Sequence, residues 1–479
     1  MDRAKRIFEN EVAARDYRKA CRQQEKYRRR FGDDSGVDYR FRAEENAVLA
    51  PIGVQNLVLE KGAELKLDEK SIIVGNIRMG YGHYRISMAI ASAAHALGYT
   101  PYWLDLNAYP ESTATKLISY QNDLYSLGSR LSQRFSLFNR LVWEPINSEG
   151  FRKLSYNAGD QKSSELMAPL LRNLPKDTPF LATHVWPAQA AIHAGFTHVV
   201  NVVPDNWPMA LHLAEGSLHT VQTPSAWLGY KMLRGMDPKR QLRPMPEGTV
   251  RYVGHYVDHE LVENIEADCA ARLERMASGA PRRFLLSIGG AGAQQKLFED
   301  VIRHLLPEIL AGRVTLLVNT GDHFGVWESI VAHIPALVGH FRQHFDDYEA
   351  ARALLESDDL HGVEVFCNHD IFAAVYTTNL LLRRCDFLLT KPGELSFYPV
   401  PKLMIHRVGG HEAWGAIRAA EVGDGSYELE KTEEVLAMLD EILAGQEILR
   451  AMCRAICENK KSGLYNGAYE AVKLAVGKA

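Results

Sequence analysis

The sequence contains the same opening twice: an apolar run rich in β-branched residues, a glycine turn and a helical stretch. The first copy runs through 71–77, the turn at 80–82 and the Ala-rich stretch 86–97. The second runs through 283–288, the turn at 289–292 and the stretch 294–310. A strand joined to a helix by a glycine turn opens a doubly wound α/β domain, whose parallel strands are buried on both faces. The chain is therefore predicted to form two Rossmann-like domains.

Further strand-like runs follow each opening. They lie at 102–106, 180–183, 198–203, 314–318, 363–366, 387–390 and 402–405. A length of 479 residues agrees with two domains, since single domains usually hold about 100 to 200 residues. We predict a first domain over 71–255 and a second over 256–450, with the chain crossing at 251–257. The helical residues 451–479 are predicted to return to the first domain.

Residues 1–70 form a predicted helical extension with a basic start. Residues 1–30 hold 11 Lys or Arg and 5 Asp or Glu. One interpretation is a solvated helix that packs on the body through Ile7, Phe8, Val12 and Tyr17. The other is a surface attracted to anionic lipid, where each basic residue contributes about 1 kcal/mol.

Composition excludes several classes of protein. A hydrophobic content of 46% with 24% charged residues is that of a globular chain, and a net charge of −4 argues against a nucleic-acid partner. No run of 18 apolar residues is present, and the first residues lack the apolar stretch of a signal peptide, so a cytoplasmic location is expected. The six cysteines form no CxxC pair and are interpreted as reduced core thiols.

The first glycine turn places chemistry at a helix start. Gly80 and Gly82 allow backbone amides to approach a ligand, and His83 follows, with Arg85 two residues on. A histidine here can take a proton from a hydroxyl or only cap the helix. A dinucleotide site is the competing interpretation, because Asp105 could bind a ribose. However, Arg85 stands where that motif requires its third glycine.

The second glycine turn is the better phosphate cradle. Gly289, Gly290 and Gly292 free the backbone beside a helix that begins without an acidic residue. Later turns add Lys391, a point charge able to neutralise a diphosphate, and Glu412, either a helix-start carboxylate or a ligand contact. No D-x-D triplet, HExxH, GxSxG or GxxxxGK[ST] motif occurs, so no metal–diphosphate clamp is expected.

In this order the motifs resemble those of the two-domain GT-B glycosyltransferases. They are most similar to monogalactosyldiacylglycerol synthases, diacylglycerol glucosyltransferases and the lipid-linked N-acetylglucosaminyltransferase of peptidoglycan synthesis. The resemblance covers about residues 71–425. It is carried by Gly80-Tyr81-Gly82-His83, Val203-Pro204-Asp205, Thr223-Pro224-Ser225-Ala226, Val253-Gly254-His255-Tyr256-Val257, Ser287-Ile288-Gly289-Gly290-Ala291-Gly292, Asn319-Thr320-Gly321 and Thr390-Lys391-Pro392-Gly393.

The resemblance implies transfer of a sugar from a nucleoside diphosphate sugar, a UDP-sugar in this family, to an acceptor hydroxyl, without a metal or cofactor. It implies that His83 and Asp205 are catalytic and that Gly80, Gly82 and Arg85 lie on the acceptor side. The implied donor-binding residues are Gly289, Gly290, Gly292, Thr320, Lys391, Gly393 and Glu412.

Two departures from the family pattern keep an alternative open. The segment 394–401 offers no glutamate at the position that binds the donor ribose, and Gly415 replaces an asparagine. The alternative is a sugar-nucleotide epimerase, or a protein that binds a sugar nucleotide without transferring it. The sequence does not specify the oligomeric state.

A lipid acceptor and contact with the inner face of the membrane are further expectations. Residues 99–143 interleave aromatic and basic side chains, which fits either an amphipathic membrane surface or a core. The aromatic and basic members are Tyr99, Tyr102, Trp103, Tyr109, Tyr120, Tyr125, Phe135, Phe138, Trp143, Lys116, Arg130, Arg134 and Arg140.

Overall fold

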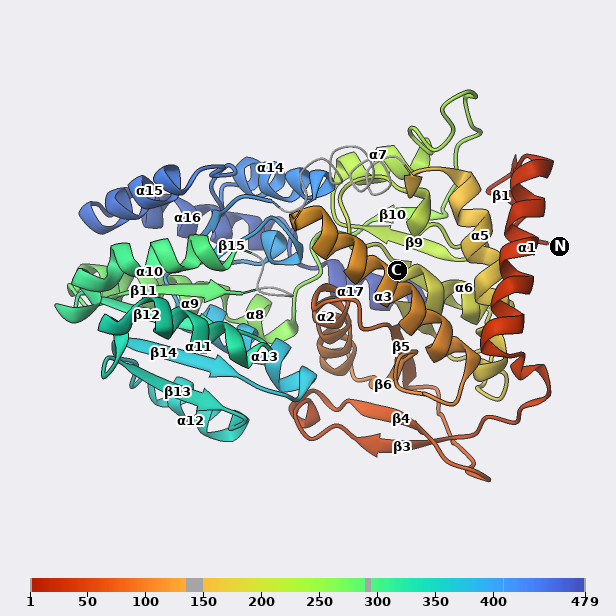
Figure 1. Cartoon of the computed structure of the whole chain (residues 1–479), viewed down its shortest axis with the longest axis horizontal. Coiled ribbons are helices and arrows are strands. Elements are labelled where there is room, and N and C mark those ends of the chain that lie inside the picture. Colours follow the sequence, from red (N-terminus) through yellow and green to blue (C-terminus); the bar gives the residue numbers. More distant parts are fainter. Residues whose placement is uncertain (1, 135–149, 289–293, 408, 478–479) are drawn as a thin grey trace.

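A computed structural model of the chain describes residues 2–134, 150–288, 294–407 and 409–477. It contains two separate, largely parallel β-sheets, each covered by helices (Figure 1). The predicted fold class, two doubly wound domains of GT-B type, is confirmed.

The first sheet has eight strands. In spatial order they are β10 (Val250–Tyr252), β9 (Leu218–Val221), β8 (Val199–Val202), β7 (Phe180–Ala182), β5 (Ser71–Asn76), β6 (Thr100–Asp105), β4 (Gln55–Leu59) and β3 (Phe41–Glu45). All neighbours are parallel except β3 and β4, which form an antiparallel edge. The central strand β5 is buried along its whole length, as its β-branched sequence predicts.

The second sheet has six parallel strands. Their order is β13 (Phe341–Phe345), β14 (Val363–Cys367), β12 (Val314–Asn319), β11 (Arg282–Ser287), β15 (Phe387–Thr390) and β16 (Lys402–Met404). The order steps outward from β11 in both directions, to β12 on one side and to β15 on the other. A ligand crevice forms at such a reversal, outside the carboxyl ends of the strands.

Helices cover both sheets. Those of the first half are α2 (Gly82–Ala96), α3 (Thr113–Arg134), α5 (Leu154–Glu165), α6 (Val185–His193) and α7 (Pro224–Lys231). Those of the second half are α8 (His259–Glu263), α9 (Ile265–Ala277), α10 (Gln295–Leu310), α11 (Phe324–His333), α12 (Tyr348–Ser357), α13 (Ile371–Arg384), α14 (Ala413–Val422), α15 (Thr432–Ala444) and α16 (Glu447–Lys461). Gly445 ends α15, and α16 begins two residues later.

The last helix, α17 (Gly467–Ala475), packs against α2 of the first domain (Figure 1). Its small buried residues Ala468, Ala471 and Ala475 join the core cluster that contains α2. The chain therefore crosses between the domains twice, once after β10 and once between α16 and α17. The crossings are hydrogen-bonded to each other, with His255 N donating to Leu464 O at 2.7 Å.

The N-terminal extension holds the helix α1 (Ala14–Phe31) after a short hairpin, β1 (Arg6–Ile7) and β2 (Asn10–Glu11). Ile7 and Phe8 are buried in a core cluster with Val12 and Tyr17 packed against it, as predicted. The strands β3 and β4 also lie within 1–70, and the sequence analysis did not predict them. They extend the first sheet beyond β6.

The aromatic stretch 99–143 is partly core. Trp103 and Tyr109 are each 3% exposed, so these two rings form no membrane surface. Tyr120 instead lies under the Arg30 guanidinium, 4.1 Å from the ring centroid. Phe135, Phe138, Arg140 and Trp143 lie outside the described residues, and the side chains of Tyr125, Arg130 and Arg134 are likewise not described. In the described part of the chain, no helix is both long enough and apolar enough to span a bilayer.

Candidate functional site

The carboxyl ends of the central strands of the two sheets face one another across the domain interface. A small cavity of about 40 Å³ lies there, lined by residues of both domains. The lining residues are Tyr81, Arg85, Ser287, Gln294, Thr390, Lys391, Gly393, Glu394 and Leu395. The turn after β5 and the turn after β15 therefore both line this cavity. The sequence had predicted them on opposite sides of one site.

His83 stands in the first turn of α2. Its Nδ1 lies 2.7 Å from the carbonyl oxygen of Thr183, at the end of β7. Because a carbonyl oxygen only accepts, Nδ1 carries the proton and Nε2 is the basic nitrogen. Burial lowers the pKa of His83, while the Thr183 carbonyl and the charge of Asp205 partly oppose that change. The ring is therefore neutral at pH 7, the state required of a base.

Asp205 follows β8 on the same side of the first sheet. Its carboxylate lies 2.9 Å from Nε2 of His212, a histidine that is 4% exposed. The edge of the His184 ring packs on His83, with centroids 4.8 Å apart. The predicted pair His83 and Asp205 thus belongs to a group of three histidines and one carboxylate.

Gly80 and Gly82 hold the first turn in place. A side chain at Gly82 would reach within 3.1 Å of the Glu394 carboxylate, so the absence of a Cβ lets the second domain approach closely. Arg85, predicted on the acceptor side, is 2% exposed and reaches across to the second domain. It donates to Asn379 Oδ1 at 3.1 Å and to Thr378 Oγ1 at 3.2 Å.

Lys391 and Glu412 come together as an ion pair, although 21 residues separate them. Glu412 also accepts from the backbone N–H of Gly409 at 3.1 Å, which fixes it at the start of α14. Gly393 lies beside the ammonium, since a Cβ there would be 3.5 Å from Lys391 Nζ. This part of the predicted donor side is assembled at the end of β15.

The remaining predicted donor-binding residues are Thr320 and the glycines of the second turn. Thr320 is fully buried, and its hydroxyl donates to the Phe366 carbonyl at 3.4 Å, so its side chain packs in the second domain. Its neighbours Gly321 and Asp322 reach the interface. Gly289, Gly290 and Gly292 lie outside the described residues.

Sequence reasoning missed the cross-domain contact of Tyr81. Its hydroxyl accepts from the Asp322 backbone N–H at 2.9 Å and also contacts the Asp322 carboxylate, which pairs with Arg78. Gly321 makes this approach feasible: it has φ +66°, and a Cβ would lie 2.2 Å from the Tyr81 hydroxyl. The signal available in the sequence was the glycine at 321.

A second aromatic contact joins the domains beside Asp205. Trp207 of the first domain and Trp414 of the second have ring centroids 5.5 Å apart at 30°. The Arg152 guanidinium lies 4.7 Å from the Trp207 centroid. The tryptophan pair and the Tyr81–Asp322 contact therefore bind the two domains at separate points.

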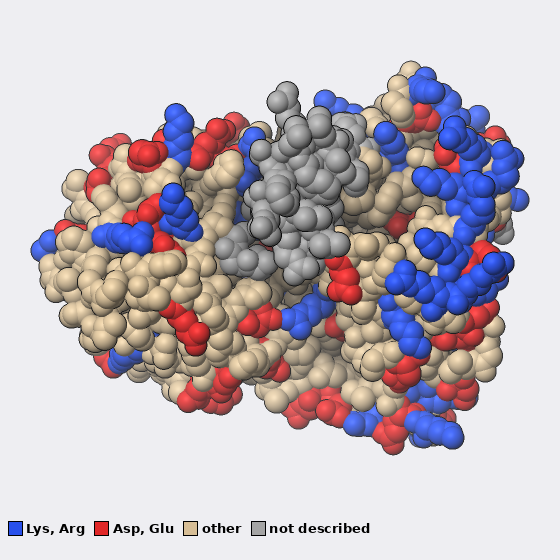
Figure 2. Space-filling view, viewed as in Figure 1, with Lys and Arg blue, Asp and Glu red and all other residues tan. Residues whose placement is uncertain are grey.

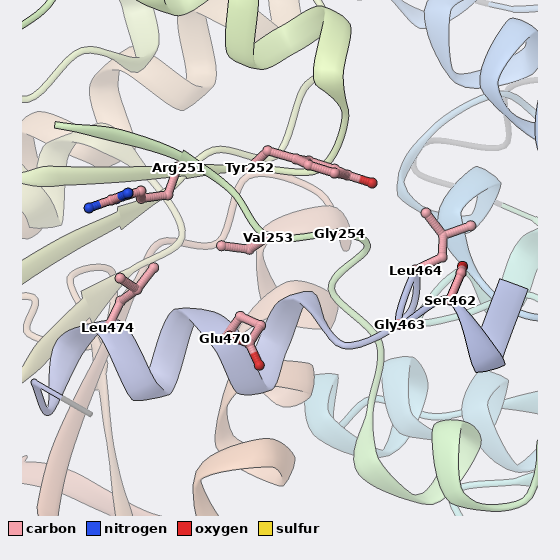
Figure 3. A pocket seen from close by; sticks show the side chains of 9 residues that line it. All are labelled: Arg251, Tyr252, Val253, Gly254, Ser462, Gly463, Leu464, Glu470 and Leu474. Atoms are coloured by element: carbon pink, nitrogen blue, oxygen red, sulfur yellow. The ribbon is translucent and has the colours of Figure 1, made fainter. Parts of the chain in front are cut away.

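Another hollow lies where the two chain crossings run side by side, away from the residues of the cleft (Figure 3). It is formed by Arg251–Gly254 from the first crossing, by Ser462–Leu464 from the second and by Glu470 and Leu474 of α17. Among the side chains that are described, no group of three or more His, Cys, Asp or Glu could hold a metal ion.

Comparison with solved structures finds similar chains at low sequence identity. A UDP-GlcNAc 2-epimerase from Neisseria meningitidis bound to UDP-GlcNAc matches with a TM-score of 0.45 and 12% identity, over 85% of this chain and 100% of that one. A UDP-forming α,α-trehalose-phosphate synthase from Burkholderia vietnamiensis matches with a TM-score of 0.44 and 12% identity, over 85% and 100%. At these scores neither similarity adds to what the strands and helices of this chain show by themselves.

No curated protein matches the chain. Two family models do match, and they divide the sequence between them. Residues 6–232 match a domain of unknown function (DUF6937), and residues 245–476 match a second domain of unknown function (DUF6938).

Proposed function

We propose that the protein is a glycosyltransferase that moves a sugar from a nucleoside diphosphate sugar, UDP-linked, to an acceptor hydroxyl. The observation that supports the proposal is the interdomain cavity: it is lined by Lys391 of the second domain and by Tyr81 and Arg85, which flank the half-buried, neutral His83 in the sequence of the first domain. In the proposed arrangement, the acceptor binds near His83 and the donor diphosphate near Lys391.

The proposed reaction needs a base on one side and charge stabilisation on the other. Nε2 of His83 takes the proton of the acceptor hydroxyl as its oxygen attacks the anomeric carbon. The bond between that carbon and the diphosphate breaks, and the diphosphate leaves with the electron pair. Lys391 and the Thr390 turn then stabilise the departing charge in place of a metal. Asp205 supports the positive charge that forms on the histidine cluster.

Nucleotide binding followed by product analysis tests the proposal. We expect UDP to raise the melting temperature of the protein, and UDP-sugars incubated with candidate acceptors to release UDP together with a glycosylated product detected by mass spectrometry. Altered sugar stereochemistry without transfer would identify an epimerase. Binding without any reaction would identify a non-catalytic relative. No binding of any nucleoside diphosphate would refute the whole proposal.

We further propose that the acceptor is presented at a membrane surface to which α1 is attracted. Lys and Arg gather along the edge of the molecule that α1 occupies (Figure 2). The exposed members on α1 are Arg15, Arg18, Lys19, Arg22, Lys26, Arg28, Arg29 and Arg30. Such a row fits an anionic lipid surface, because each basic residue near it contributes about 1 kcal/mol.

Vesicle sedimentation tests this contact. Vesicles containing phosphatidylserine are expected to pellet the protein, and purely zwitterionic vesicles are not. Reversing Arg18 and Arg22 to glutamate should weaken binding by about tenfold or more. The matched control reverses Arg450 and Arg454, on the exposed side of α16, and should have little effect. Membrane contact through α1 would be contradicted if both double variants lost vesicle binding equally. It would also be contradicted if the wild type did not pellet with the vesicles.

A further inference from the structure

Arg85 begins in one domain and ends in the other. Its backbone belongs to α2, yet its two terminal nitrogens donate to Asn379 and Thr378 on α13. A fully buried arginine normally bonds a carboxylate through both arms. Here the two arms bond neutral oxygen atoms, so most of the guanidinium charge is not neutralised by direct contact.

Arg85 is one of the residues that line the cavity, and its third nitrogen is Nε. Nε is buried and makes no hydrogen bond to any residue that the structure describes. Glu394 Oε1 lies 3.9 Å away, beyond hydrogen-bonding distance. A buried N–H without an acceptor destabilises the protein by about 1 to 3 kcal/mol, and a ligand oxygen in the cavity would remove that cost.

We propose that Arg85 binds the donor diphosphate together with Lys391, so that the anion site is built from both domains. This inference rests on the proposed function, because it assumes a diphosphate ligand in that cleft. Two cations, Arg85 and Lys391, line the cavity together with the Glu394 carboxylate, and Glu412 pairs with Lys391. The Arg85–Glu394 contact is longer than the Lys391–Glu412 contact. Replacing Glu394 by a phosphate oxygen therefore loses less electrostatic energy than replacing Glu412.

With Arg85 as a ligand contact, a bound diphosphate would also connect the two domains. Since Lys391 belongs to the second domain and Arg85 to the first, a bound diphosphate joins the domains directly. A ligand that contacts both domains only in the closed arrangement shifts the population toward that arrangement. Arg85 is thus a donor-binding residue, rather than an acceptor-side one.

Titration calorimetry on the full chain tests the assignment, with UDP, inorganic pyrophosphate and uridine as ligands. The substitution Arg85→Gln is expected to weaken the binding of UDP and pyrophosphate roughly 10- to 100-fold and to leave uridine unchanged. Arg78→Gln is the matched control, because Arg78 also pairs across the interface, with Asp322, but does not line the cavity. It should change pyrophosphate affinity less than about threefold.

A second variant avoids disturbing the buried arginine. Glu394→Gln removes the carboxylate that competes for Arg85, and should tighten pyrophosphate binding about threefold or more. Three results would each overturn the assignment of Arg85. Arg85→Gln could bind pyrophosphate as tightly as the wild type, Arg78→Gln could lose as much affinity as Arg85→Gln, or Glu394→Gln could show no increase in affinity. In those cases UDP binding by the wild type would leave the proposed function standing. Failure of the wild type to bind either UDP or pyrophosphate would overturn both.

Discussion

His83→Ala is expected to lower kcat by about 100-fold or more while changing donor affinity little, because the proposed role of His83 is proton transfer. The rate of the wild type should be constant above pH 6.5 and should fall at lower pH. A base acts in its neutral form, and burial lowers the pKa of His83 from its usual value. Steady-state kinetics across pH 5 to 8 measures both effects.

The control for this prediction is a histidine outside the cleft. His304 on α10 pairs with Asp440 at the surface, so His304→Ala should retain wild-type turnover and pH dependence. A His83→Ala enzyme within tenfold of the wild type would show that another group takes the proton. His184, whose ring packs against His83, would then be the first residue to replace.

Asp160→Asn is expected to remove a large pH dependence of stability. Asp160 is 3% exposed on α5, and burial raises its pKa to about 8. Between the usual value of 3.8 and about 8, the folded state holds a proton that the unfolded state has lost. Stability therefore falls as pH rises through this window, by about 1.4 kcal/mol per pH unit. From pH 5 to pH 7 the variant should gain roughly 3 kcal/mol over the wild type.

Urea unfolding at several pH values measures that difference. The exposed carboxylate Asp123 on α3 supplies the matched substitution, Asp123→Asn, which controls for the replacement of a helical aspartate by asparagine. Burial also raises the pKa of Asp258, to about 7, and this second acid titrates in both proteins, so the subtraction isolates Asp160. A difference between Asp160→Asn and wild type that does not grow with pH would mean that Asp160 is hydrated.

Most of the buried strands were predictable, whereas the polar edge strands β3 and β13 were not. Central strands such as β5 and β12 are continuous apolar runs, because helices cover both of their faces. The edge strands β3 (FRAEE) and β13 (FRQHF) carry mostly polar, partly exposed side chains. No hydrophobic period marks such segments, and only pairing with a neighbouring strand makes them extended.

For the candidate site as well, local sequence patterns predict single residues but not contacts between distant parts of the chain. His83 and Lys391 were predictable as candidates, because each follows a strand within a recognisable turn. The contacts of Tyr81 with Asp322 and of Trp207 with Trp414 join residues more than 200 positions apart. They depend on how the two domains are oriented, and no local pattern encodes that orientation. The contacts of Arg85 with Asn379 and Thr378 likewise have no local signal, because a sequence position places only the backbone.

The return of α17 to the first domain bears on how the chain is made. During synthesis the amino-terminal domain emerges first and usually folds as a unit. Here one face of α2 is covered by Ala468, Ala471 and Val472, which follow the whole second domain in the sequence. The first domain therefore lacks part of its core until the second domain has been synthesised.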